Sequence, residues 1–225
     1  MRKQIMLLPA TLALFCAVLT PSVATGQSLD SVRVSRYLVM ANDYLQRNQL
    51  DSVRWAAARA RGLAEKTRQP LLRAWADQFI GSCHFYEGRY EKGIALQTEV
   101  WRVADSLGDA LLRAHSQKMI GWMYTEMGKE REALQLFRAS LPAFRANAAR
   151  DIQRSIGITY FGLATAYFYL SHFDSALIYY DSAITARPQM DSREMALTLA
   201  DRAAVKRDHL QNLPGALQDA SQALT

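Results

Sequence analysis

Glycine, proline and cysteine are scarce in this chain of 225 residues. It has 11 Gly and 6 Pro, few for an all-β protein rich in tight turns, whereas the good helix formers Ala, Leu, Arg and Gln are abundant. Of the two cysteines, Cys16 lies in a segment that we expect to be removed, so only Cys83 remains. One thiol cannot close an internal disulfide. The composition therefore predicts an all-α fold held by packing, with Cys83 as a small buried side chain; a disulfide between two chains is the alternative.

Motifs that carry chemistry are also missing. The histidines are far apart in sequence, and no two have metal-ligand spacing on one helix; they are His84, His115, His172 and His209. No nucleophile elbow and no dinucleotide-binding glycine pattern is present. We therefore expect no catalytic, cofactor or metal site, and a protein that is not an enzyme.

The first 26 residues have the three zones of a secretory signal peptide. Arg2 and Lys3 are followed by a mostly apolar, uncharged run over residues 5–19 and then by small residues, among them Ala24 and Gly26. As a helix this run would extend about 22 Å, less than a bilayer core, which disfavours the alternative of a membrane anchor. We predict export by the general secretory route, to the periplasm or beyond, with cleavage near residues 24–26. Removal of residues 1–26 leaves 25 Lys and Arg against 21 acidic residues, a mild net charge of +4, and nucleic acid is not an expected partner.

One spacing pattern recurs along the rest of the chain. A small residue is followed by a large side chain three positions on, by another small residue twelve positions on, and then by a further large and small pair. The fourth copy is the clearest, with Ala164, Tyr167, Ala176, Tyr180 and Pro188. The small anchors of the five copies are spaced 40, 40, 43 and 40 residues apart; they are Ala41, Gly81, Gly121, Ala164 and Ala204.

This pattern resembles the tetratricopeptide repeat, in a longer form that bacterial signalling proteins often carry. The resemblance implies a right-handed superhelical solenoid of antiparallel helix pairs over residues 27–225, with about five repeats and ten helices. Gly88 and Gly128 are expected to end first helices in a left-handed conformation. Asp51 and Asp174 are expected just before second helices, where each would cap free N–H groups.

In this family the first helices line a concave groove that holds peptides. Carrying the groove positions over from each anchor places aromatic side chains where the packing pattern does not need them; ordinary core packing is the alternative. The second and third copies contribute Trp75, Gln78, Ser82, Phe85, Tyr86, His115, Lys118, Trp122, Thr125 and Glu126, and the fourth and fifth contribute Ile158, Phe161, Thr165, Phe168, Tyr169, Thr198, Asp201, Val205, Asp208 and His209.

Residues 155–173 carry no charge, counting His172 as neutral. The repeat pattern explains one face of this helix, and the groove residues Ile158, Phe161, Phe168 and Tyr169 make up the rest, so something apolar should cover them. A membrane span is the alternative for this stretch, although we expect none in the mature chain.

The resemblance predicts an extracytoplasmic bacterial scaffold or adaptor that binds a protein or peptide. The alternative is the sensory ectodomain of a membrane signalling protein, in a chain cut short. The pattern reaches Thr225 inside a second helix without a polar capping helix, which suggests truncation, a partner at this end, or self-association there.

Overall fold

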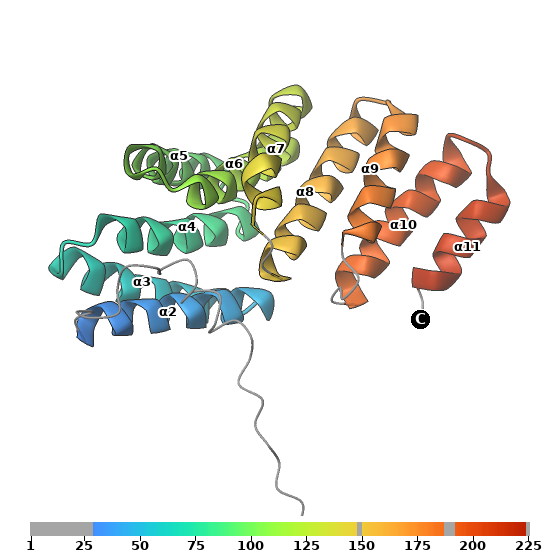
Figure 1. Cartoon of the computed structure of the whole chain (residues 1–225). Coiled ribbons are helices and arrows are strands. Elements are labelled where there is room, and N and C mark those ends of the chain that lie inside the picture. The colour runs from blue at the N-terminus through green and yellow to red at the C-terminus, as the bar shows by residue number, and fades with distance from the viewer. Residues whose placement is uncertain (1–28, 148–149, 187–191, 224–225) are drawn as a thin grey trace, which may run out of the picture. The chain divides into compact units, whose positions relative to one another are not determined.

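The computed structural model describes residues 29–147, 150–186 and 192–223, and Figure 1 shows the helices in chain order. These ranges contain ten helices and no strand, which confirms the all-α prediction and the number of helices. The helices are α2 (Leu29–Gln46), α3 (Leu50–Lys66), α4 (Pro70–Tyr86), α5 (Tyr90–Leu107), α6 (Ala110–Glu126), α7 (Glu130–Arg145), α8 (Arg150–Tyr169), α9 (Phe173–Thr185), α10 (Ser192–Asp208) and α11 (Leu213–Ala223).

The chain divides into two compact units, one ending at Arg89 and the other beginning at Tyr90. In the first unit α2 packs on α3, α3 packs on α4, and α2 also touches α4. In the second unit each helix packs on the next from α5 to α11, and the first helices α6 and α8 touch as well. The boundary falls inside the second repeat copy, between α4 and α5. A single domain over residues 27–225, wound as one right-handed superhelix, stays a prediction.

Left-handed residues follow seven of the described helices, and two of these residues are the glycines at which they were expected. Gly88 and Gly128 have φ of 69° and 70°, and Gly108 has φ of 71°. At four other turns the left-handed residue is not glycine but Asn48, Arg68, Ser171 or Gln211. Only glycine adopts this conformation without steric cost, so local hydrogen bonds must hold the other four turns. After Ser171, for example, the His172 N–H donates to the carbonyl of Tyr167 at 2.9 Å.

The prediction that Asp51 and Asp174 precede and cap second helices is wrong. Asp51 is the second residue of α3 and Asp174 the second of α9, and neither precedes its helix. The residues at the N-cap positions are Gln49 and His172, and neither side chain makes a capping hydrogen bond. Both carboxylates still lie in a first turn, where the positive end of the helix dipole favours them. Two side chains do cap helices: Oδ1 of Asp109 accepts a hydrogen bond from the Leu112 N–H of α6 at 2.9 Å, and Oδ1 of Asn212 accepts one from the Gly215 N–H of α11 at 3.0 Å.

The core of the second unit is built around Phe137 of α7, which is 0% exposed. A Cβ added at Gly121 of α6 would lie 2.9 Å from Cε1 of this ring, and one at Gly162 of α8 would lie 2.5 Å from Cζ. Real Cβ atoms do not approach so closely, so both helices need glycine there. Gly121 is the small anchor of the third copy, whereas Gly162, just before the fourth anchor, was not singled out from the sequence.

No helix in the described ranges, α8 included, combines the length and the apolar character that crossing a bilayer requires.

Replacing Gly162 with Ala should force the Phe137 ring to shift in a filled core. We expect the free energy of unfolding of the second unit to fall by about 1–3 kcal/mol. The matched control is Gly62→Ala in α3, because a Cβ there meets nothing within 4 Å; this change should raise the stability of the first unit by about 0.5–1 kcal/mol through helix propensity. Thermal unfolding followed by circular dichroism compares the two variants. A gain in stability from both changes would contradict the proposed fit around Phe137.

Candidate functional site

The predicted groove residues of the first unit lie on α4. Trp75 and Gln78 are buried, at 8% and 5% exposed, and the Gln78 amide donates to Oγ of Ser82 at 3.2 Å. Phe85 is partly buried, and its ring centroid lies 5.2 Å from that of Tyr86, which is 53% exposed. Of these residues, Tyr86 therefore has the most solvent-exposed side chain.

On α6 of the second unit, the predicted residues differ in how far they are covered. Lys118 is only 7% exposed; its Nζ donates to Oγ of Ser155 at 3.4 Å and lies 5.5 Å from the centre of the Phe144 ring. Burial, together with the charge of Lys118, lowers the pKa of His115 well below its ordinary value, so this imidazole is neutral at physiological pH. Glu126 is exposed.

Trp122 of α6 is partly buried and packs on two rings. Its centroid lies 5.5 Å from that of Phe137 and 5.6 Å from that of Phe161. Trp122 thus adds to the packing between α6, α7 and α8, whatever it contacts outside the chain.

Predicted residues from two different repeats influence the hydroxyl of Tyr180, on α9. Burial raises the pKa of this hydroxyl, and the charges of Asp201 on α10 and Tyr169 on α8 act in the same direction, while Thr165 of α8 opposes them. The ring of Phe161 lies 6.0 Å from that of Tyr180. We call these five residues, Phe161, Thr165, Tyr169, Tyr180 and Asp201, the Tyr180 cluster. Tyr180 is 2% exposed, whereas Tyr169 at the edge of the cluster is 60% exposed.

The Asp201 carboxyl has an unusual electrostatic environment. Burial raises its pKa, and no charged neighbour offsets this effect. Among the described side chains, no Lys or Arg lies within ion-pair distance of it. On the same helix, Arg202 and Lys206 bind Asp219 instead, at 2.6 and 2.9 Å. No Lys or Arg of the described residues therefore balances the Asp201 carboxyl when it ionises.

Aromatic rings extend from the cluster toward the end of α10. The Phe173 ring stacks on His209 with centroids 3.7 Å apart, and Phe168 meets His209 edge-on at 5.8 Å. Phe161 and Phe168 also pack against a buried group formed by Ala164, Ala176, Tyr180 and Val205. Helices α9 and α10 thus provide an apolar cover over part of the uncharged stretch 155–173 in α8 and after it, and Ile158 is partly buried as well.

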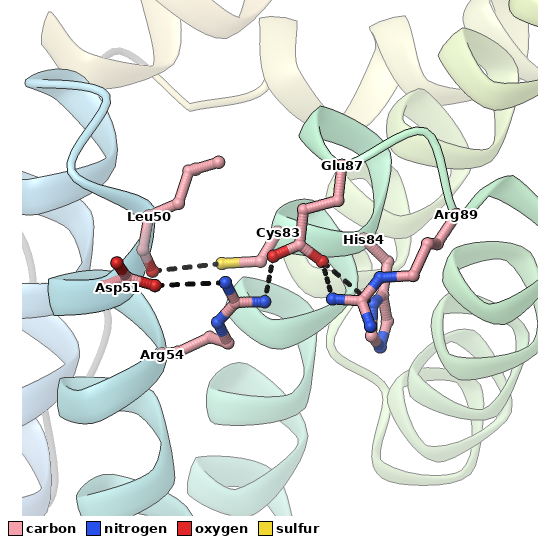
Figure 2. Close-up of polar contacts among 7 residues, drawn as sticks. All are labelled: Leu50, Asp51, Arg54, Cys83, His84, Glu87 and Arg89. Carbon is pink, nitrogen blue, oxygen red and sulfur yellow. Dashed lines mark hydrogen bonds and ion pairs between the residues drawn. The ribbon is translucent and has the colours of Figure 1, made fainter.

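An ion cluster in the first unit joins α3 to the end of α4 (Figure 2). Glu87 follows the last residue of α4 and pairs with Arg54 of α3 and with Arg89, while Arg54 also binds Asp51 at 3.2 Å. A carboxylate at this end of a helix is disfavoured by the dipole. Burial also acts to raise the pKa of Glu87, but hydrogen bonds and charge from Arg89 and Arg54 outweigh it and hold the pKa below its ordinary value.

Cys83 lies beside this cluster. Its thiol is free and its side chain is buried, which confirms the predicted burial. Its Sγ lies 3.9 Å from the carbonyl oxygen of Leu50. Burial raises the pKa of the thiol to about 11, so at neutral pH almost none of it is the nucleophilic thiolate. The cluster acts as a link between two helices.

Within the described ranges, no group of three or more His, Cys, Asp and Glu side chains is placed to hold a metal ion.

Replacing Asp201 with Asn should stabilise the chain at neutral pH. The pKa of Asp201 is raised in the folded state. The contribution of this group to the free energy of unfolding is therefore fully present below its ordinary pKa of 3.8 and is lost as pH rises through the higher pKa of the folded state. Asn cannot ionise, and so the melting temperature of Asp201→Asn should exceed that of the parent at about pH 7 and match it in acid. The control is Asp208→Asn on the same helix, because Asp208 is paired with Arg207 and its pKa is lowered. A gain in melting temperature that is equal in both variants, or absent from Asp201→Asn, would contradict this account.

Comparison with known proteins identifies the repeats. Two family models described as tetratricopeptide repeat match the chain, one over residues 72–146 and the other over residues 158–190. A search of curated proteins gave no significant match.

Several solved structures share the fold. BtubC from P. vanneervenii superposes with a TM-score of 0.66 at 16% identity, over 85% of this chain and 78% of that one. The apo form of RapI gives 0.59 at 12% identity, over 95% and 89%. A Rap protein complexed with competence and sporulation factor gives 0.68 at 8% identity, over 96% of this chain and 60% of that one. The matched models show that the chain contains tetratricopeptide repeats, over residues 72–146 and 158–190, and its paired helices share the fold of these solved structures.

Proposed function

We propose that the chain is an exported adaptor that binds a protein or peptide partner, and that in the second unit the partner contacts the Tyr180 cluster and its neighbours on α8 and α10. One observation carries this proposal. Residues at the expected groove positions of two successive first helices pack together, because Phe161 and Phe168 of α8 lie against a buried group that contains Tyr180 of α9 and Val205 of α10.

The fold supports a binding role. Repeats of this family stack helix pairs into extended surfaces, and such surfaces are what these proteins use to bind. The Rap protein that shares this fold was solved in complex with competence and sporulation factor. By analogy in fold alone, a partner held by the chain is the simplest function that uses the surface described above.

The exposed rings are the best candidates for contact with a partner. Tyr169 is 60% exposed and Tyr86, in the other unit, is 53% exposed. Large aromatic side chains supply contact area at low entropic cost and often dominate the energy of an interface. Trp122 and Phe161 are packed on other rings, so replacing either would disturb the fold as well as a surface.

A substitution at Tyr169 tests the proposal directly. A photo-crosslinking amino acid placed at Tyr169 should capture the partner in living cells, because this side chain is both exposed and at the edge of the cluster. The matched control is Ile178 of α9, a second helix, which is 63% exposed. With the captured partner purified, Tyr169→Ala should weaken binding by about 1–3 kcal/mol and leave the melting temperature unchanged. Equal crosslinking at both positions, or none at Tyr169, would reject this surface.

The exported location rests on the charged, apolar and small-residue zones of residues 1–26. Removal of this segment should give a chain in the cell envelope or the medium that starts within a few residues of Ala24. N-terminal sequencing of the protein from fractionated cells measures this. Protein that starts at Met1 and remains with the cytosolic fraction would rule out export. The sensory-ectodomain alternative uses the same surface and is distinguished by whether the native gene product continues into a membrane span.

A further inference from the structure

We propose that two arginines of α7, Arg138 and Arg145, bind an acidic helix of a polypeptide partner, with one carboxylate of that helix on each guanidinium. We call Arg138 and Arg145 the arginine pair. Neither residue is at a predicted groove position, so the arginine pair marks a second surface of the chain. This inference goes beyond the proposed function and does not depend on it.

Each arginine of the pair is held in place by a tyrosine of α8. Arg145 donates to the hydroxyl of Tyr160 at 2.5 Å, and its guanidinium carbon lies 5.7 Å from the centre of that ring. Arg138 donates to the hydroxyl of Tyr167 in the same way, and its guanidinium carbon also lies 5.7 Å from the ring centre. A phenol and its ring orient a guanidinium without cancelling its positive charge.

The two tyrosines are themselves fixed by a third ring. Tyr179 of α9 stacks on Tyr167 with centroids 5.4 Å apart and ring planes 7° apart, and its centroid lies 6.2 Å from that of Tyr160. All three rings are partly buried and pack on the core cluster that contains Phe137. The guanidiniums therefore rest on a rigid surface, so they lose little conformational freedom when a ligand binds them.

The charge of the arginine pair is not balanced within the described part of the chain. Both side chains are exposed, and no described carboxylate lies within ion-pair distance of either. The other charges of α7, Glu130, Arg131 and Glu132, lie in its first turn and have a negative sum, while Asp181 of α9 pairs with Arg202. Each guanidinium has five N–H donors and gives one to a phenol, so donors are left for a carboxylate.

The spacing of the arginine pair selects a helical partner. Arg138 and Arg145 are seven positions apart, about 10 Å along a helix, and Tyr160 and Tyr167 are seven apart as well. A partner helix carries its side chains i and i+7 on one face at this same separation. In an extended strand, residues on one face are about 7 or 13 Å apart, and neither distance fits. Two carboxylates at i and i+7 of a helix lying along α7 and α8 would therefore reach both guanidiniums.

The test uses two synthetic helices of the same composition. Each peptide consists of Ala and Gln with two Glu, has capped ends, and is held helical by a hydrocarbon staple. In the first peptide the two Glu are seven positions apart; in the second they are five apart, which places them about 140° apart around the helix. Each peptide is titrated at low salt into the purified chain carrying 15N in its arginines, and the Nε–H signals are followed by NMR.

We expect saturable shifts of the Arg138 and Arg145 signals with the first peptide. The second peptide should bind at least about fivefold more weakly, since it can form only one of the two ion pairs at a time. The comparison of the two peptides needs no change to the protein, so it does not depend on how any variant folds.

Three variants complete the design, with melting temperatures measured beside binding. Arg138→Gln and Arg145→Gln should each weaken binding of the first peptide by about fivefold. The control is Lys92→Gln on α5, which removes an exposed positive charge from the same unit and should change binding by less than about twofold. The proposal is overturned if the two peptides bind alike, if the shifts do not saturate, if either arginine variant binds as the parent does, or if Lys92→Gln loses binding equally.

An anionic membrane is the other surface that two exposed arginines could meet. Residues 90–225 carry fifteen basic and fifteen acidic residues, so general attraction of this unit to a negative surface is weak. Vesicles that contain phosphatidylglycerol, added in place of the peptides, should leave the Arg138 and Arg145 signals unchanged. A response to these vesicles without one to the first peptide would assign the arginine pair to a membrane and reject the acidic helix.

Discussion

The fit of one phenylalanine ring sets the spacing on which the second unit depends. Phe137 of α7 occupies the space that a Cβ would need at Gly121 of α6 and at Gly162 of α8, so both helices are drawn to a fixed distance from α7. Gly162 lies three positions before Thr165 on the same helix. The packing around Phe137 thus also fixes the part of α8 that carries Thr165 and Tyr169. A fully buried ring therefore helps to set the geometry of the surface that we propose for binding.

Much of this architecture could be predicted from spacing alone. The anchors near 40-residue intervals predicted the helix pairs, and the glycines at 88 and 128 predicted left-handed turns. Errors came where the outcome depends on one or two residues. Asp51 and Asp174 were predicted to precede their helices, but each helix begins at the residue before the aspartate. Helix ends respond to local competition between turns and caps, and a repeat period does not resolve that competition.

The side-chain pairings that define the sites could not be predicted from the sequence. Arg54 and Glu87 are separated by 33 positions, and the repeat predicts that their helices adjoin but not which side chains pair. Arg202 has several carboxylates within a few helical turns or on neighbouring helices, and the sequence does not show which of them it binds. In the structure Arg202 binds Asp219, a buried acid on α11, and this choice depends on packing between α10 and α11.

Charge is divided unevenly between the two units. Residues 29–89 carry ten Lys and Arg against six acidic residues, while residues 90–225 carry fifteen of each. The whole net charge of the mature chain therefore resides in the first unit. With no net charge in the second unit, long-range electrostatic steering contributes little to the approach of a charged ligand to that unit.

The buried thiol of Cys83 has a further consequence for kinetics. In the described ranges it is the only cysteine, and its sulfur lies at the contact of α3 with α4, inaccessible to reagents while that contact is closed. A thiol in such a place reacts only during moments when the two helices separate. The rate of thiol modification is then the equilibrium constant for opening multiplied by the rate at which the exposed thiol reacts. Measuring this rate would therefore report how often α3 and α4 separate.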